Sequence, residues 1–191
     1  DFDTQLKTQQ KKYGMRLIDI ETDVECGIRK YVGVFSKGSE SQTVRTGMSW
    51  TELENKYRAM KRAGWHLIDI ETYEDNGTRY WAAAWNKGNK PHWLRAMPRK
   101  QFEDLQQSVD GTEQLIDMES WRDEGGRQIA GLFYESSDRA VMETGENWQK
   151  FIPLWKQMGK DKQRLVDLEV YPDTTDRRWE STFSQALDGK A

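Results

Sequence analysis

The sequence predicts an α+β fold of four repeats, each made of a helix followed by a β-hairpin. The clearest hairpin lies at 64–85, where alternating residues flank an Asp-Asn-Gly turn signal at 75–77. The first-strand pattern of this hairpin, Leu-x-Asp-x-Glu, recurs at Leu17, Leu67, Leu115 and Leu165. Because repeats of this length cannot bury an apolar face alone, neighbouring repeats must stack as a short solenoid or close into a ring. Of these two, we predict a closed pseudo-fourfold ring with antiparallel strands inside and helices outside.

A helix is expected before each hairpin, at 1–12, 49–63, 98–109 and 147–158. The first helix is weakly apolar, with Phe2 and Leu6 at helical spacing. The second has the strongest start signal, because Ser49 and Glu52 form a capping box in which each side chain satisfies a backbone donor. Pro153 lies inside the fourth helix, and we expect it to kink this helix or to move its start.

The two strands of each hairpin are expected at 15–22 and 28–36, 67–71 and 79–85, 114–120 and 127–134, and 164–170 and 177–183. Polar loops follow the first two hairpins, and a short extra strand is expected after each of these loops, at 43–46 and 93–97. We therefore predict a single domain over 1–191 with a short C-terminal tail. Its four repeats are about 1–36, 37–86, 87–135 and 136–184.

The composition argues against several classes of function. Charged residues make up 32% of the chain but the net charge is −3, so we expect neither nucleic acid nor an anionic membrane as a partner. Cys26 is the only cysteine and the two histidines lack the spacing of a zinc site, so we expect no metal and no cofactor. The composition leaves the oligomeric state open and fits both a cytosolic protein and a mature secreted one.

One face of each hairpin is predicted to be an aliphatic core. In the first repeat this face carries Ile18 and Ile20 on the first strand and Val32 and Val34 on the second strand. The equivalent positions in the second and third repeats are also aliphatic or alanine. Helices covering this face would complete a two-layer arrangement.

The opposite face is expected to carry acidic, basic and aromatic side chains in fixed columns. The first strands contribute a Glu and an Asp in every repeat, the aspartates being Asp19, Asp69, Asp117 and Asp167. The second strands contribute Arg29, Arg79, Arg127 and Arg177. After each arginine comes a large, a small and an aromatic residue at alternate positions, such as Trp81, Ala83 and Trp85. If the turn places Glu21 opposite Arg29, each hairpin presents a cross-strand charge pair.

These columns allow three interpretations. In the structural one, they are ion pairs and backbone hydrogen bonds that recur because the unit recurs. In the second, rings stack on a flat ligand and charged groups bond its polar edge. The ligand-binding residues would then be the aspartates and arginines of the columns together with Tyr31, Trp81, Trp85, Trp179 and Trp121. Hydrolysis by a carboxylate pair is the third, and it would need one repeat to differ electrostatically from the others.

The repeat at 64–85, with its following strand at 93–97 and a helix start such as Gly47-Met48-Ser49, resembles a bacterial tandem-repeat family. It is also similar to the tryptophan-rich N-terminal domain of fungal polyglycine hydrolases, in which such repeats precede a β-lactamase-like hydrolase domain. The resemblance covers about 13–183 and is weakest in the fourth repeat, where Lys162 replaces a glycine. It implies a repeat-built accessory or binding domain, commonly secreted, and carries no enzymatic activity over to this chain.

The sequence thus favours a non-catalytic binding module, lectin-like or peptide-binding, whose partner is a carbohydrate or a peptide. Stacked rings beside charged groups motivate this interpretation. The alternative is a structural or protein-interaction repeat domain in which the aromatic face is packed core. On that alternative, truncating a tryptophan of the face costs stability and has no effect on a ligand.

Overall fold

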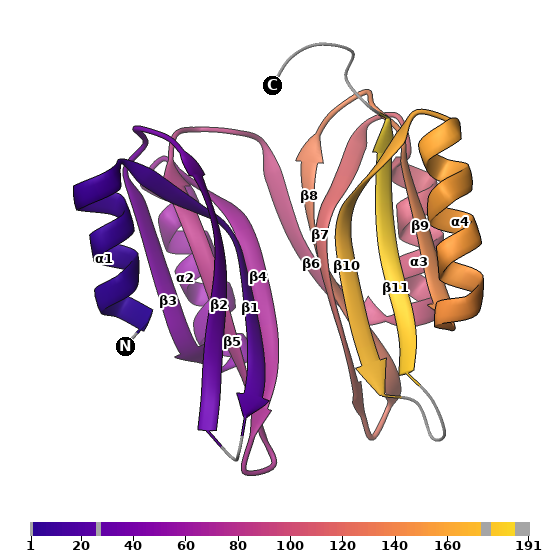
Figure 1. Ribbon diagram of the computed structural model, residues 1–191, viewed down its shortest axis with the longest axis horizontal. Helices are drawn as coiled ribbons and strands as arrows, with labels where there is room; N and C mark the ends of the chain where they lie inside the picture. Colours follow the sequence, from indigo (N-terminus) through magenta and orange to yellow (C-terminus); the bar gives the residue numbers. More distant parts are fainter. Residues whose placement is uncertain (1, 26–27, 173–176, 186–191) are drawn as a thin grey trace. The chain divides into compact units, whose positions relative to one another are not determined.

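The computed structural model describes residues 2–25, 28–172 and 177–185, and the chain divides into two compact units, Asp1–Pro91 and His92–Ala191 (Figure 1). The first unit contains α1 (Phe2–Tyr13), β1 (Met15–Glu25), β2 (Ile28–Lys37), β3 (Gln42–Met48), α2 (Trp50–Arg62), β4 (Trp65–Asp75) and β5 (Thr78–Lys87). The second unit contains β6 (His92–Pro98), α3 (Arg99–Val109), β7 (Glu113–Asp123), β8 (Gly126–Glu135), β9 (Ala140–Glu146), α4 (Trp148–Lys160), β10 (Gln163–Pro172) and β11 (Arg177–Gln185).

The predicted repetition of a helix followed by an antiparallel hairpin is confirmed in all four repeats. The closed ring and the single-domain organisation stay predictions. The predicted tail beyond 184 lies outside the described residues, apart from Gln185 at the end of β11. No helix in the described part of the chain is long and apolar enough to cross a membrane.

Three of the sheets share one strand order that includes the strand in front of the helix. β3 pairs with β5, which also pairs with β4, so β3 and β4 run in the same direction on either side of β5. The same order relates β6, β8 and β7, and then β9, β11 and β10. The repeating unit is therefore strand, helix, hairpin, and each short extra strand belongs to the hairpin that follows it along the chain.

A β-bulge in every first strand changes which residues are buried. Leu17 lies opposite Phe35 and Asp19 lies opposite Val34, so Ile18 has no residue opposite it. The prediction that Ile18 and Ile20 share the core face is wrong: Ile18 is 49% exposed, while Leu17 and Ile20 are buried. The extra residue breaks the period of two on which the prediction depended. The register shifts at the same place in β4, β7 and β10.

The second strand of the first repeat also differs from the prediction. Val32 and Val34, expected in the core, are 54% and 47% exposed. The aromatic side chains of the second strands face the helices instead. The ring of Trp50 in α2 lies 4.9 Å from that of Trp81 in β5, between ring centroids, and Leu53 of α2 is fully buried. α2 therefore covers the face of its hairpin that carries Trp81, whereas Ala82, the equivalent of Val32, packs with Leu17 and Ile20 of the first hairpin.

Side chains cap the starts of α2 and α4. Ser49 and Glu52 form the predicted capping box at the start of α2. The side chain of Asn147 caps α4 by accepting a hydrogen bond of 3.0 Å from the backbone N–H of Lys150. α4 then runs through Pro153 to Lys160. Capping by side chains satisfies backbone N–H groups that have no partner inside the helix.

The first helix of each unit also contacts the sheet of the following repeat. In the first unit the Gln10 side chain of α1 donates to the side-chain oxygen of Gln42 in β3 over 3.2 Å. In the second unit the Gln106 side chain of α3 donates to the carbonyl of Ala140 in β9 over 2.7 Å. Within each unit the neighbouring hairpins also meet, β1 against β4 and β7 against β10. Two successive repeats thus share one core.

Candidate functional site

The aromatic columns lie beneath the helices. Trp81 and Trp85 of β5 are 1% and 0% exposed, and the equivalent Phe133 and Phe183 are also fully buried. Trp179 is half-buried, stacked against Phe151 of α4 with ring centroids 5.7 Å apart. A ligand would reach Trp81 or Trp85 only after α2 had moved. The packing of these rings is that of a hydrophobic core.

The small residue between the rings does not leave open space over the strand. A Cβ atom built at Gly131 would collide with the ring of Phe102 from α3 and would lie 2.8 Å from Leu115 Cδ1. At Gly33 such an atom would lie 2.7 Å from Leu17 Cδ1. Glycine at these positions lets a neighbouring side chain approach the backbone closely. The space is occupied by the protein's own side chains.

The aspartates and glutamates of the first unit lie where β1 meets β4. The carboxyl groups of Asp19 and Asp69 are hydrogen-bonded to each other. Burial raises the pKa of Asp19, and the hydrogen bonds from Asp69 and from the Ile20 backbone lower it in part. Because Asp69 is only 4% exposed, this pair belongs to the interior of the unit.

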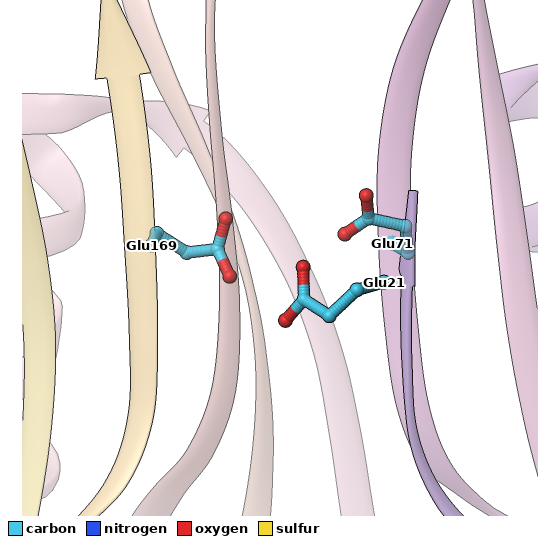
Figure 2. A group of neighbouring side chains, drawn as sticks. All are labelled: Glu21, Glu71 and Glu169. Carbon is cyan, nitrogen blue, oxygen red and sulfur yellow. The ribbon is translucent and has the colours of Figure 1, made fainter. Parts of the chain in front are cut away.

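Glu21 and Glu71 project from these same two strands (Figure 2). Their carboxylate oxygens lie within 4.8 Å of each other. Glu71 accepts hydrogen bonds from the backbone N–H of Thr22, at 3.0 Å, and from its hydroxyl, at 2.8 Å. Glu71 therefore joins β4 to the backbone of β1, which is the kind of contact that the structural interpretation predicts.

The second unit repeats this arrangement where β7 meets β10. An oxygen of Asp167 accepts a hydrogen bond of 2.9 Å from the backbone N–H of Met118. Asp117 and Glu119 of β7 are buried, at 7% and 3% exposed. Glu169, labelled in Figure 2, follows on β10 and is half-buried. Carboxylates of the columns thus bond the backbone of the neighbouring hairpin in both units.

The arginines do not pair as the sequence predicts. Arg29 lies opposite Val24 and Glu21 lies opposite Val32, so the expected cross-strand charge pair of Glu21 and Arg29 is wrong. The described pairing continues as far as Glu25 opposite Ile28, so Arg29 lies only one pair before the end of the ladder. Nη1 of Arg29 instead donates to the hydroxyl of Thr22 over 3.4 Å.

The same arginine-to-hydroxyl contact occurs in two other hairpins. Nη1 of Arg79 lies 3.3 Å from the Thr72 hydroxyl, and Nη1 of Arg127 lies 3.1 Å from the Ser120 hydroxyl. These hydroxyl residues follow the glutamate of each first strand, so a column of Thr and Ser was the sequence signal for them. Arg177 lies in β11 and is exposed.

Each unit has one tyrosine in the sequence column of Trp121, Tyr73 in the first unit and Tyr171 in the second, and this tyrosine contacts an arginine of the preceding hairpin. The guanidinium of Arg29 stacks on the ring of Tyr73, 4.0 Å from its centroid. Arg127 stacks in the same way on Tyr171, at 3.2 Å. The Tyr73 hydroxyl accepts hydrogen bonds of 2.9 Å from the Tyr31 hydroxyl and from the Gly47 backbone. Burial raises the pKa of Tyr73, so its hydroxyl stays protonated.

The spacing of these pairs reveals a longer period. Arg29 and Arg127 are 98 residues apart, and so are Tyr73 and Tyr171. In each pair the arginine belongs to the first repeat of the unit and the tyrosine to the second. The tyrosine column alone could have indicated this period, because tyrosine occurs there only in alternate repeats. The arginine–tyrosine contact therefore recurs once every two repeats, and not in every repeat.

The second unit adds a buried glutamate to this contact. Glu180 of β11 is fully buried, and burial raises the pKa of its carboxyl group. The Ser120 hydroxyl and the guanidinium groups of Arg127 and Arg99 lower this pKa in part. Burial also lowers the pKa of Arg127. The first unit has Ala82 at the equivalent position, so this charge network belongs to one unit alone.

The remaining predicted site residues are more accessible. Tyr31 and Arg29 of β2 line an open groove of about 820 Å³ together with residues of α1. The ring of Tyr31 lies 5.1 Å from that of Phe2 in α1, between centroids. Trp121 of β7 is half-buried, opposite Gln128 in β8. The groove beside α1 thus brings together two of the predicted ligand-binding residues, Tyr31 and Arg29.

One repeat of the chain has a known relative. Residues 40–88 match the model of a family described as a polyglycine hydrolase-like structural repeat. These residues contain β3, α2, β4 and β5, which are the strand, helix and hairpin of one complete repeat. A comparison with curated proteins gave no match to the chain. The match at 40–88 confirms the resemblance of this chain to the polyglycine hydrolase-like structural repeat.

Proposed function

We propose that this chain is a non-catalytic structural repeat domain, in which pairs of repeats form rigid units. The observation that carries the proposal is the burial of the aromatic columns beneath the helices, with Trp85, Phe133 and Phe183 fully buried. The acidic columns support it because they bond the backbone of the neighbouring hairpin. On this proposal the recurring residues maintain the fold, and partners contact other parts of the surface.

The test compares a buried tryptophan with an exposed one. Trp85→Ala removes a fully buried ring and should lower the free energy of unfolding by about 3–5 kcal/mol. The matched control is Trp155→Ala, because Trp155 of α4 is 47% exposed and its loss should cost much less. Chemical denaturation measures both values. Equal effects of the two substitutions would contradict a core role for the aromatic columns.

A ligand titration gives the second arm of this test. The purified protein is titrated with oligosaccharides and short peptides while tryptophan fluorescence and melting temperature are followed together. A ligand that binds the native state raises the melting temperature by mass action. We expect no saturable response that depends on Trp81 or Trp85. A ligand whose binding is lost in a folded Trp81→Phe variant would overturn the proposal.

Ligand binding by the columns remains a second candidate, and one observation favours it. Tyr31 and Arg29 line the open groove beside α1, so an aromatic ring and a cation are accessible there together. A carbohydrate or a peptide would fit such chemistry. In the titration this candidate predicts a saturable response that Tyr31→Ala abolishes and Trp179→Phe leaves intact.

A further inference from the structure

The central strand of three sheets has partners on both edges. The second strand of the hairpin lies between the first hairpin strand and the strand that precedes the helix. The register at the start of this extra strand is the same each time. Thr43 lies opposite Trp85, Trp93 opposite Phe133, and Val141 opposite Phe183. The contact between the extra strand and the hairpin is thus established three times in this chain.

The first sheet lacks this third strand. Within the described residues β2 pairs with β1 alone, so the edge of β2 turned away from β1 has no strand partner. An unpaired edge of this kind is a template for another strand. Edge strands usually carry charges, prolines or bulges that discourage pairing, and β2 has exposed lysines towards its ends, Lys30 and Lys37. Between them it contains no proline and exposes Val32 and Val34 by 54% and 47%.

The open groove lies on this strand. We call it the β2 groove; its volume is about 820 Å³, and it is lined by Phe2, Asp3 and Gln5 of α1, Tyr31 and Phe35 of β2, and Thr46 of β3. Tyr31 and Phe35 are only half-buried there. The equivalent Trp81 and Trp85 of the second repeat are 1% and 0% exposed. β2 therefore has the sequence pattern of a central strand and the exposure of an edge strand.

The three internal strands define what would fit. Their sequences are QTVRTGM, HWLRAMP and AVMETGE. Each has an apolar residue at its third position: Val44, Leu94 and Met142. Val44 lies opposite Ala84, which corresponds to Val34 of β2. A strand docked on β2 in this register would place its apolar third residue beside the exposed Val34.

We propose that the β2 groove binds an extended peptide segment of a partner protein, which adds to the sheet as an antiparallel third strand. Main-chain hydrogen bonds to β2 supply affinity, and alternate side chains give specificity for an apolar third residue. The partner segment has the pattern of β3, β6 and β9 and contains no proline before its end. This inference does not depend on the proposed scaffold function, because an open edge can bind a strand whatever the role of the aromatic columns.

The first experiment supplies the strand covalently. Residues 41–50 (SQTVRTGMSW) are copied and joined directly before Asp1, so that Asp1 takes the place of Thr51 and the graft keeps the 50-residue spacing between equivalent positions such as Leu17 and Leu67. A tethered strand has a high effective concentration and needs little intrinsic affinity. We expect the melting temperature to rise by about 4 °C and the exchange of the β2 amides to slow roughly tenfold. The control graft carries Thr43→Pro and Arg45→Pro and should give neither effect.

The second experiment supplies the strand as a free peptide. The peptide SQTVRTGMS is added to ¹⁵N-labelled protein, and saturable shifts are expected in β2 and the first turns of α1. Val34→Lys in the protein should weaken this binding at least tenfold. Val166→Lys is the matched control, because Val166 of β10 is a 44% exposed valine on another strand, and this variant should bind like the original.

Three outcomes would overturn the inference. One is that the native and the proline grafts melt at the same temperature. Another is that Val34→Lys and Val166→Lys weaken peptide binding equally. The third is a concentration-dependent dimer that Val34→Lys abolishes, because the edge would then pair two copies of this chain. A failure of the scaffold proposal would appear elsewhere, in the comparison of Trp85→Ala with Trp155→Ala.

Discussion

At the scale of single residues, the fourth repeat departs from the others just after its helix. Gly14, Gly64 and Gly111 follow the first three helices with φ of 63°, 73° and 81°. Lys162 takes this place after α4 with φ 59°. The left-handed conformation costs a residue with a side chain about 1–2 kcal/mol, and glycine adopts it freely. The fourth repeat, which matches the repeat pattern least well, therefore has a strained backbone at Lys162.

Replacing Lys162 by glycine should relieve this strain. We expect Lys162→Gly to raise the free energy of unfolding by roughly 0.5–1 kcal/mol, since the greater freedom of glycine in the unfolded chain offsets part of the gain. Lys162→Ala is the control, because it removes the same charge from the end of the helix and keeps the strain. Urea denaturation of the three proteins measures the difference. Equal stability of the two variants would show that backbone conformation is not the cause.

At the scale of secondary-structure elements, the sequence predicted more about which elements form than about how they pair. The hairpins follow from their alternating residues and turn signals, and the start of α2 follows from Ser49 and Glu52. The bulge at Ile18 could not be predicted, because an extra residue leaves the local composition unchanged while it reverses the two faces of the strand. Because of that reversal, the strict alternation of the sequence predicts the aromatic face on the wrong side, away from the helices that cover it in the structure.

The contacts of the recurring residues could not be predicted either, because they join residues that are far apart in the sequence. Arg29 contacts Tyr73 in the following hairpin, and no local pattern encodes a contact across more than 40 residues. The columns were recognised correctly as recurring features. Their role was ambiguous because a binding site and a structural network can have the same period. The burial of Asp69 and Glu71 and their bonds to the neighbouring strand favour the structural network over the binding site.

The contact between β7, β8 and β11 should make the second unit sensitive to pH. Burial raises the pKa of Glu180 above the usual value of a glutamate, which is about 4.3. The folded state therefore binds the proton more tightly than the unfolded state does. Stability contributed by the protonated carboxyl is fully present below about pH 4.3 and is lost as the pH rises through the raised pKa of the folded state.

Glu180→Gln should remove this loss of stability at rising pH, because glutamine has no proton to lose in this range. The free energy of unfolding is measured from pH 4 to pH 8 for both proteins, and we expect the variant to be the more stable one at pH 7 and to decline less between these limits. Glu143→Gln provides a comparison, because Glu143 also has a raised pKa but lies on β9 and is less buried. If the original protein proves more stable at pH 7, the attraction of Arg127 and Arg99 outweighs the cost of burial.

At the scale of the whole molecule, the pairing of repeats matters more than their number. The hydrogen bonds between hairpins and the stacking of arginine on tyrosine occur within Asp1–Pro91 and again within His92–Ala191. Each unit also has a helix that contacts both of its sheets. A unit of two repeats thus buries apolar faces that a single repeat would leave open.

We therefore expect the fragments 1–91 and 92–191 each to fold alone with a cooperative thermal transition. Each keeps its own core and its own arginine–tyrosine stack, which are the contacts that join two repeats. A fragment 1–62 is the control: it keeps both helices of the first unit but loses β4 and β5, and with them Tyr73 and the buried Trp81 and Trp85. Circular dichroism during heating should show a sigmoidal transition for the two larger fragments and none for 1–62. A non-cooperative melt of 92–191 would mean that two repeats are too few for a stable unit, because this fragment contains every strand of its two sheets.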